Sequence, residues 1–118
     1  MNSATMVWWL IVGHALCDYP LQGDSMAKGK NRHSPPFNVP PGAKPGTVWP
    51  YWLGAHALIH GGAVALVTGS VLLGICEVAA HFVIDMLKCE NITTLHHDQA
   101  LHVACKLAWV WLAMQGVR

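Results

Sequence analysis

The sequence has few charged residues. Asp, Glu, Lys and Arg make up only 11% of its 118 residues, against roughly a quarter in ordinary soluble domains. The formal net charge at pH 7 is +1, so we expect neither a basic surface for nucleic acid nor an acidic tail. Hydrophobic residues make up 53% of the chain, which includes six tryptophans. This composition favours a membrane protein over a soluble helical bundle.

Several motifs of familiar enzymes are missing as well. The four cysteines are scattered, without a CxxC pair or a disulfide framework, and we expect them to be small buried thiols. No serine has a GxSxG setting, which argues against a hydroxyl nucleophile. No glycine-rich phosphate loop is present either. The residues left for chemistry are histidines and aspartates.

Four apolar runs predict four helices, over residues 4–21, 50–67, 71–88 and 98–114. Residues 22–49 hold five of the seven prolines and read as a long loop. The other two connections are short, so the helices they join should be antiparallel neighbours. We therefore predict one all-α domain over residues 1–118, an integral membrane up-down four-helix bundle with a long Pro-rich loop between its first and second helices.

Each apolar run contains two metal-type side chains four residues apart, which on a helix share one face. In the first and third runs the pair lies near the C-terminal end, and in the other two in the N-terminal half. Alternating helix directions should therefore bring all pairs to one end of the bundle. Such groups are costly to bury unless they are paired or bind an ion. The predicted metal ligands are His14, Asp18, His56, His60, His81, Asp85, Asp98 and His102.

Five imidazoles and three carboxylates suit a divalent metal, with zinc first and iron or manganese as alternatives. Eight groups exceed the needs of one tetrahedral ion, so they predict either two adjacent ions or one ion with partners that orient its ligands. Glu77 lies one turn before His81 and is the candidate general base, or an extra ligand. Gln22, Lys88 and Gln99 are weaker candidates for contacts with an anionic substrate.

Simpler interpretations exist for single residues. One histidine on an apolar helix face is more often a packing residue than a ligand, and we expect this of His33, His96 and His97. Asp98 could cap the last helix. A pathway for protons or ions would compensate the buried polar groups as a metal does.

Three strings carry a resemblance to a known family: His14-Ala-Leu-Cys-Asp18-Tyr-Pro-Leu-Gln22, Glu77-Val-Ala-Ala-His81-Phe-Val-Ile-Asp85-Met-Leu-Lys88 and Asp98-Gln99-Ala-Leu-His102. With His56 and His60 between them, their HxxxD, HxxxH, ExxxHxxxD and DQxxH motifs resemble a domain-of-unknown-function family of small multi-helix membrane proteins from bacteria and their phages. The resemblance implies a membrane location. In pattern alone the chain is remotely similar to membrane-bound metal-dependent hydrolases.

Together these features predict a membrane-embedded metal-dependent hydrolase of a phosphoester or lipid-linked substrate. Lysines and arginine in the loop at residues 28–44 place the site on the cytoplasmic side of the bacterial inner membrane. The expected partners are the bilayer, an anionic or lipid-linked small molecule and, since four helices seal a polar site poorly, further copies of the chain. The alternatives are a transporter of protons or metal ions, and a structural protein, phage-encoded and host-interacting, whose helices a metal staples.

Overall fold

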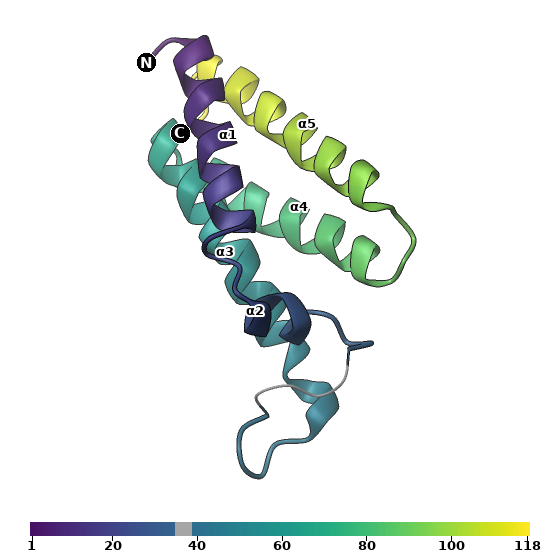
Figure 1. The fold of residues 1–118 in the computed structure, drawn as a ribbon. Coiled ribbons are helices and arrows are strands. Elements are labelled where there is room, and N and C mark those ends of the chain that lie inside the picture. The colour runs from purple at the N-terminus through teal and green to yellow at the C-terminus, as the bar shows by residue number, and fades with distance from the viewer. Residues whose placement is uncertain (35–38) are drawn as a thin grey trace.

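The computed structural model describes residues 1–34 and 39–118 and is all-helical (Figure 1). Each predicted run forms one long helix, and the connection predicted as a loop holds a short helix and a 3-10 turn. The elements in chain order are α1 (Ser3–Asp18), α2 (Asp24–Gly29), η1 (Pro45–Thr47), α3 (Trp49–Thr68), α4 (Val71–Cys89) and α5 (Leu95–Met114). The described part of the chain thus has five α-helices and not the four predicted.

The predicted integral membrane bundle is wrong. In residues 1–34 and 39–118, none of the helices has the length and hydropathy that crossing a bilayer requires. A span needs about 20 predominantly apolar residues, whereas α1 has 16 and α4 carries Glu77, Asp85 and Lys88. The sequence-based prediction counted apolar residues and gave too little weight to the paired polar residues, which lower the mean hydropathy of each helix.

The helices pack around α3, which contacts α1, α2, α4 and α5. α4 runs antiparallel to α3, and α5 returns beside α4 towards the start of α1 (Figure 1). α2 lies beyond the end of α1 and contacts α3. As a result the C-terminal part of α1, the middle of α3, the second half of α4 and the first half of α5 meet in one region.

Local capping sets where the helices begin. Thr94 Oγ1 accepts a hydrogen bond from the His97 backbone N–H at 3.3 Å and caps α5. Asp98 is therefore not the cap, contrary to one interpretation of the sequence. The helix starts before it, and its side chain is buried.

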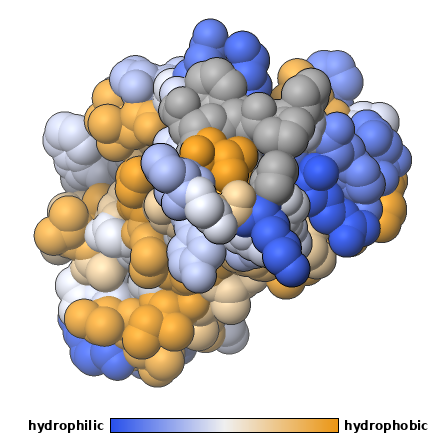
Figure 2. Space-filling model, turned by 90° about the horizontal axis from the view of Figure 1, so that it is seen from below, coloured by the Kyte–Doolittle hydropathy of each residue, from blue (hydrophilic) through white to orange (hydrophobic). Residues whose placement is uncertain are grey.

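One half of the bundle has an apolar core cluster, near the start of α1 and the end of α5. It consists of Met6, Leu10, Val64, Leu73, Val110 and Ala113. Large apolar side chains also lie on the surface, for example Trp8, Leu66 and Trp111. Seen from the loop end, apolar and polar residues both reach the surface (Figure 2). Apolar surface of this kind often marks an interface, and self-association stays a prediction.

Two glycines let α3 and α4 touch through their backbones. A Cβ on Gly61 would lie 2.6 Å from the Gly74 carbonyl oxygen and would collide with the Val78 side chain, and one on Gly74 would lie 2.7 Å from the Gly61 carbonyl oxygen. Real Cβ atoms do not approach backbone so closely. The two helices can therefore hold this spacing only with glycine at both positions.

Gly61→Ala should lower the free energy of unfolding by about 1–3 kcal/mol, since the helices must separate to admit the methyl group. Chemical denaturation measures this value. Gly62→Ala is the matched control, because its Cβ would meet nothing within 4 Å and alanine favours a helix by up to about 1 kcal/mol. Equal effects of the two substitutions would contradict the close-contact interpretation.

Candidate metal centre

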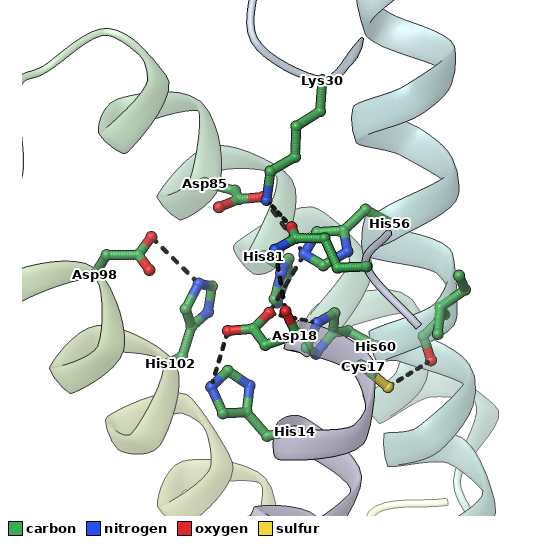
Figure 3. Close-up of polar contacts among 12 residues, drawn as sticks. His14, Cys17, Asp18, Lys30, His56, His60, His81, Asp85, Asp98 and His102 are labelled. Carbon is green, nitrogen blue, oxygen red and sulfur yellow. Dashed lines mark hydrogen bonds and ion pairs between the residues drawn. The ribbon is translucent and has the colours of Figure 1, made fainter. Parts of the chain in front are cut away.

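The predicted ligand residues converge in one region of the bundle (Figure 3). α1, α3, α4 and α5 each contribute one of the four pairs. All eight residues are shielded from solvent: the Asp18 side chain is 9% exposed, His14 is 6% exposed, and the other six are at most 1% exposed. The alternation of helix direction thus brings the four pairs together.

The five imidazole rings are in contact with one another. His81 lies in the middle, with ring centroids 3.7 Å from His60 and 4.1 Å from His102, both stacked. His56 approaches His60 edge-on at 4.7 Å, and His14 lies 5.2 Å from His60. Protonated rings would repel at these distances, so the arrangement favours neutral imidazoles.

Burial also favours the neutral form. Desolvation lowers the pKa of His60 from 6.5 to about 4. It lowers the pKa of His14, and that of His81, which neighbouring imidazoles lower further. Neutral imidazole is the form that binds a metal, so these three rings are ready to act as ligands at neutral pH.

Many ring nitrogens in the cluster have no hydrogen-bond partner although they are buried. Among the described residues these are Nδ1 of His14, Nδ1 and Nε2 of His56, Nδ1 of His60, Nε2 of His81 and both nitrogens of His102. Leaving one buried polar group unpaired costs about 1–3 kcal/mol. A bound cation would satisfy several of these nitrogens at once.

Within residues 1–34 and 39–118 the potential ligand atoms fall into three groups, each with its atoms within 4.8 Å of one another. The first group, Asp18 with His56, His60 and His81, offers one carboxylate oxygen and three nitrogens. Ligand atoms of a tetrahedral zinc lie roughly 3.4 Å apart, so the first group suits such an ion. The other two are Glu77 with His81 and His102, and Asp85 with Asp98 and His102.

Asp18 is held as a carboxylate inside the cluster. Its Oδ1 lies 3.0 Å from His60 Nε2 and 3.4 Å from His56 Nε2, and its Oδ2 accepts a hydrogen bond from Gln99 Nε2 at 2.9 Å. Burial raises the pKa of Asp18, but these three neighbours outweigh burial and hold it well below its usual value. Asp18 is therefore anionic at neutral pH.

Gln99 also joins α1 to α5. Its amide oxygen lies 3.2 Å from His14 Nε2, and its amide nitrogen lies 3.2 Å from Asp98 Oδ2. Gln99 was predicted to contact substrate, and that role stays a prediction. The contacts show that it orients Asp18 and His14.

Glu77, the predicted general base, is fully buried with both oxygens engaged. Trp109 Nε1 donates to its Oε2 at 2.5 Å, and Lys106 Nζ forms an ion pair with its Oε1. The same Oε1 lies 3.2 Å from His81 Nδ1. Because a carboxylate only accepts, Nδ1 carries the proton and Nε2 keeps its lone pair for a ligand. These contacts favour a positioning role, and the base role stays a prediction.

Two lysines neutralise the third donor group. Lys30 Nζ lies 2.5 Å from Asp85 Oδ2 and also binds Gln22. Lys88 Nζ lies 2.8 Å from Asp85 Oδ1 and 3.1 Å from Asp98 Oδ2. Burial raises the pKa of Asp85, but the two ammonium groups outweigh it and lower this pKa, and the carboxylates raise the pKa of Lys88.

The sequence analysis missed Lys106, Trp109 and Lys30. Lys106 stands alone in an apolar run one turn after His102, and that isolation was an available signal. Nothing in the sequence distinguishes Lys30 from the other lysines of the loop. His33, His96 and His97 are exposed and lie outside the cluster, and His33 binds Glu90.

The metal-free protein should lose stability as the pH falls from about 6.5 towards 4. His14, His60 and His81 have pKa values below 6.5 when folded, so in this range the unfolded chain binds more protons. Urea unfolding in a chelator, at several pH values across this range, measures the loss. His33→Ala should show the same loss, since His33 lies outside the cluster. A constant free energy of unfolding from neutral pH down to about 4 would contradict the burial of neutral imidazoles.

Comparison with known proteins gives one match. No curated protein and no solved structure matches the chain. The family described as "Protein of unknown function (DUF3307)" matches residues 6–117. This match confirms the resemblance to a domain-of-unknown-function family that the His and Asp motifs indicated. The chain belongs to the DUF3307 family.

Proposed function

We propose that the protein is a metal-dependent hydrolase that binds a divalent ion through Asp18, His56, His60 and His81. The observation that carries this proposal is the set of buried ring nitrogens without partners around one anionic carboxylate. Three nitrogens and one oxygen suit zinc best, with iron or manganese as alternatives.

The charge of the buried cluster supports a cation. With neutral imidazoles, the cluster holds four carboxylates, Asp18, Glu77, Asp85 and Asp98, and three ammonium groups, Lys30, Lys88 and Lys106. One net negative charge is therefore left inside the bundle, where uncompensated charge is costly. A divalent ion would reverse this to one net positive charge, which a single anionic ligand would balance.

Such an ion would supply the hydrolytic nucleophile by lowering the pKa of its water from about 15.7 towards about 7. Asp18 and the three imidazoles would hold the ion, and Glu77 would keep the His81 ring in place. His14 and His102 flank the first group, and both have unpartnered ring nitrogens. His14 is the candidate to accept a proton from the nucleophile or to give one to the leaving group.

A structural metal site is the second candidate function. Burial of the eight ligand residues favours it, because structural sites are closed to water whereas catalytic ones keep one position open. X-ray absorption of the zinc-loaded protein distinguishes them. Four protein ligands and no other donor would favour the structural site, and an additional water-derived oxygen would favour the hydrolase.

The direct test is hydrolysis by metal-loaded protein. The loaded protein should hydrolyse members of a panel of phosphomonoesters, phosphodiesters and carboxyl esters, and a chelator should abolish this activity. Asp18→Asn should lose it while keeping its helical circular dichroism. A stoichiometrically loaded, folded protein that hydrolyses nothing in the panel, and whose ion has four protein ligands and no water-derived oxygen, would overturn the hydrolase proposal.

A further inference from the structure

Lys30 reaches the metal centre from outside the four long helices. It follows α2 directly, yet it is only 4% exposed. Gly29 makes this possible: a Cβ there would lie 2.5 Å from Trp52 Cδ1, so only glycine lets the backbone pass so close to α3. The ammonium group of Lys30 is thereby held inside the bundle, against Asp85 Oδ2 and Gln22.

This ammonium group meets Asp85, a member of the third donor group (Figure 3). The oxygen it binds, Asp85 Oδ2, is also 3.5 Å from Nε2 of His56, a member of the first group. Lys88 instead approaches Asp85 Oδ1 and has a side chain that is 27% exposed. Lys30 is therefore the inner cation of the pair and Lys88 the outer one.

The third donor group has an independent sign of a missing ligand. His102 is 1% exposed, and neither of its ring nitrogens has a hydrogen-bond partner. Its Nε2 lies 3.4 Å from Asp98 Oδ1, but this contact does not have the geometry of a hydrogen bond (Figure 3). Two aspartates and one histidine with atoms within 4.8 Å of one another form an incomplete set of ligands for a divalent ion.

We propose that Asp85, Asp98 and His102 form a second divalent cation site, and that the Lys30 ammonium group takes the place of this cation until the ion displaces it. The proposal extends the metal centre of the proposed function and rests on it for the neighbouring first ion. Lys88 stays in contact with the aspartates from its outer position. Binding of the second ion thus releases Lys30 from Asp85.

The second ion also indicates a substrate class. With Lys30 outside the cluster, four carboxylates and two ammonium groups remain, which leaves two net negative charges. Two divalent ions would change this to two net positive charges, against one net positive charge with the first ion alone. A phosphoester dianion would balance them, whereas a neutral ester would not. Paired metal ions are a known means of holding the attacking and leaving oxygens in phosphoryl transfer. We therefore infer that the doubly loaded site acts on phosphoesters.

The test is a calorimetric titration of the metal-free protein with zinc, comparing wild type, Lys30→Met and Lys44→Met. Met keeps the length of the Lys30 side chain without its charge. We expect wild type to bind one ion tightly and a second weakly. Lys30→Met should bind the second ion at least about tenfold more tightly, since a competing like charge is gone. Lys44 is exposed in the segment before η1, and Lys44→Met should behave as wild type.

Asp98→Asn should abolish the second binding event and keep the first.

Limited trypsin digestion of the wild-type protein measures the release of Lys30 directly. Cleavage after Lys30 should accelerate with the second equivalent of zinc and not with the first. Unchanged binding of the second ion in Lys30→Met, or unchanged cleavage after Lys30 at the second equivalent, would overturn the proposal. These readouts do not involve hydrolysis, so two bound ions without activity would overturn only the proposed function.

Discussion

Replacement of His60 by alanine should lower the affinity for the first divalent ion by about 100-fold or more. His60 is a member of the first donor group, is fully buried and lies 3.0 Å from the Asp18 carboxylate. Loss of a residue that only orients a ligand already costs about 10–100-fold in metal affinity, so loss of a ligand should cost at least as much. Elemental analysis of the purified protein and competition with a chromophoric chelator measure the affinity.

His33→Ala is the matched control for this experiment. His33 is exposed and binds Glu90 outside the cluster, so its loss should leave the metal content near one ion per chain. Wild-type protein that is folded and free of zinc, iron and manganese would contradict the metal centre. Equal metal content in the two variants would exclude His60 as a ligand.

Lys106→Met should lower the free energy of unfolding of the metal-free protein by about 3–5 kcal/mol, the usual cost of breaking a buried ion pair from one side. Lys106 and Glu77 have side chains that are 2% and 0% exposed, so the substitution leaves the Glu77 carboxylate buried without its counter-charge. Denaturant unfolding in a chelator measures the change. A loss well below this range would show that water reaches Glu77.

The double variant Glu77→Gln with Lys106→Met separates charge from packing. It removes both charges and keeps a group that can accept from Trp109, so it should recover a large part of the lost stability. Arg32→Met is the surface control, because the Arg32–Glu90 pair is largely solvated and such pairs contribute little. A double variant no more stable than Lys106→Met would show that the pair acts mainly through packing.

Helical periodicity made most of the candidate site predictable. Residues four apart share a helix face, and helices joined by short connections run antiparallel. These two rules predict that the four pairs lie at the same end of the bundle, where the structure places His14, His56, His81 and His102. The ring stacking and the three donor groups depend on side-chain packing, which the sequence does not encode locally.

The membrane prediction failed because of the charged residues on the long helices. Glu77, Asp85, Lys88 and Lys106 lie on helices of largely apolar composition, where they compensate one another in pairs. From the sequence, buried charge was expected to require compensation by a metal or an ion pathway. The Glu77–Lys106 pair between α4 and α5 was overlooked because its partners are 29 residues apart in sequence.

The connection between α1 and α3 was the least predictable part. Its prolines and charges predicted a loop, yet Gly29 and Lys30 pack against α3 and α4. The short helix α2 positions Lys30, and no periodic pattern in the sequence indicates that this lysine is buried. Similarly, α5 begins at Leu95, three residues before the predicted start at Asp98, and Asp98 is buried.

The glycine contact between α3 and α4 has a consequence for the choice of ion. Gly61 directly follows His60, and Gly74 lies two helical turns before His81, so this contact determines how far apart the two stacked rings stand. A side chain at either glycine would move α3 and α4 apart and would increase the distances between the imidazole nitrogens by a fraction of an ångström. Preference for a smaller or larger ionic radius is thus adjustable at positions that offer no ligand atom, and relatives with alanine there would be expected to select a different metal.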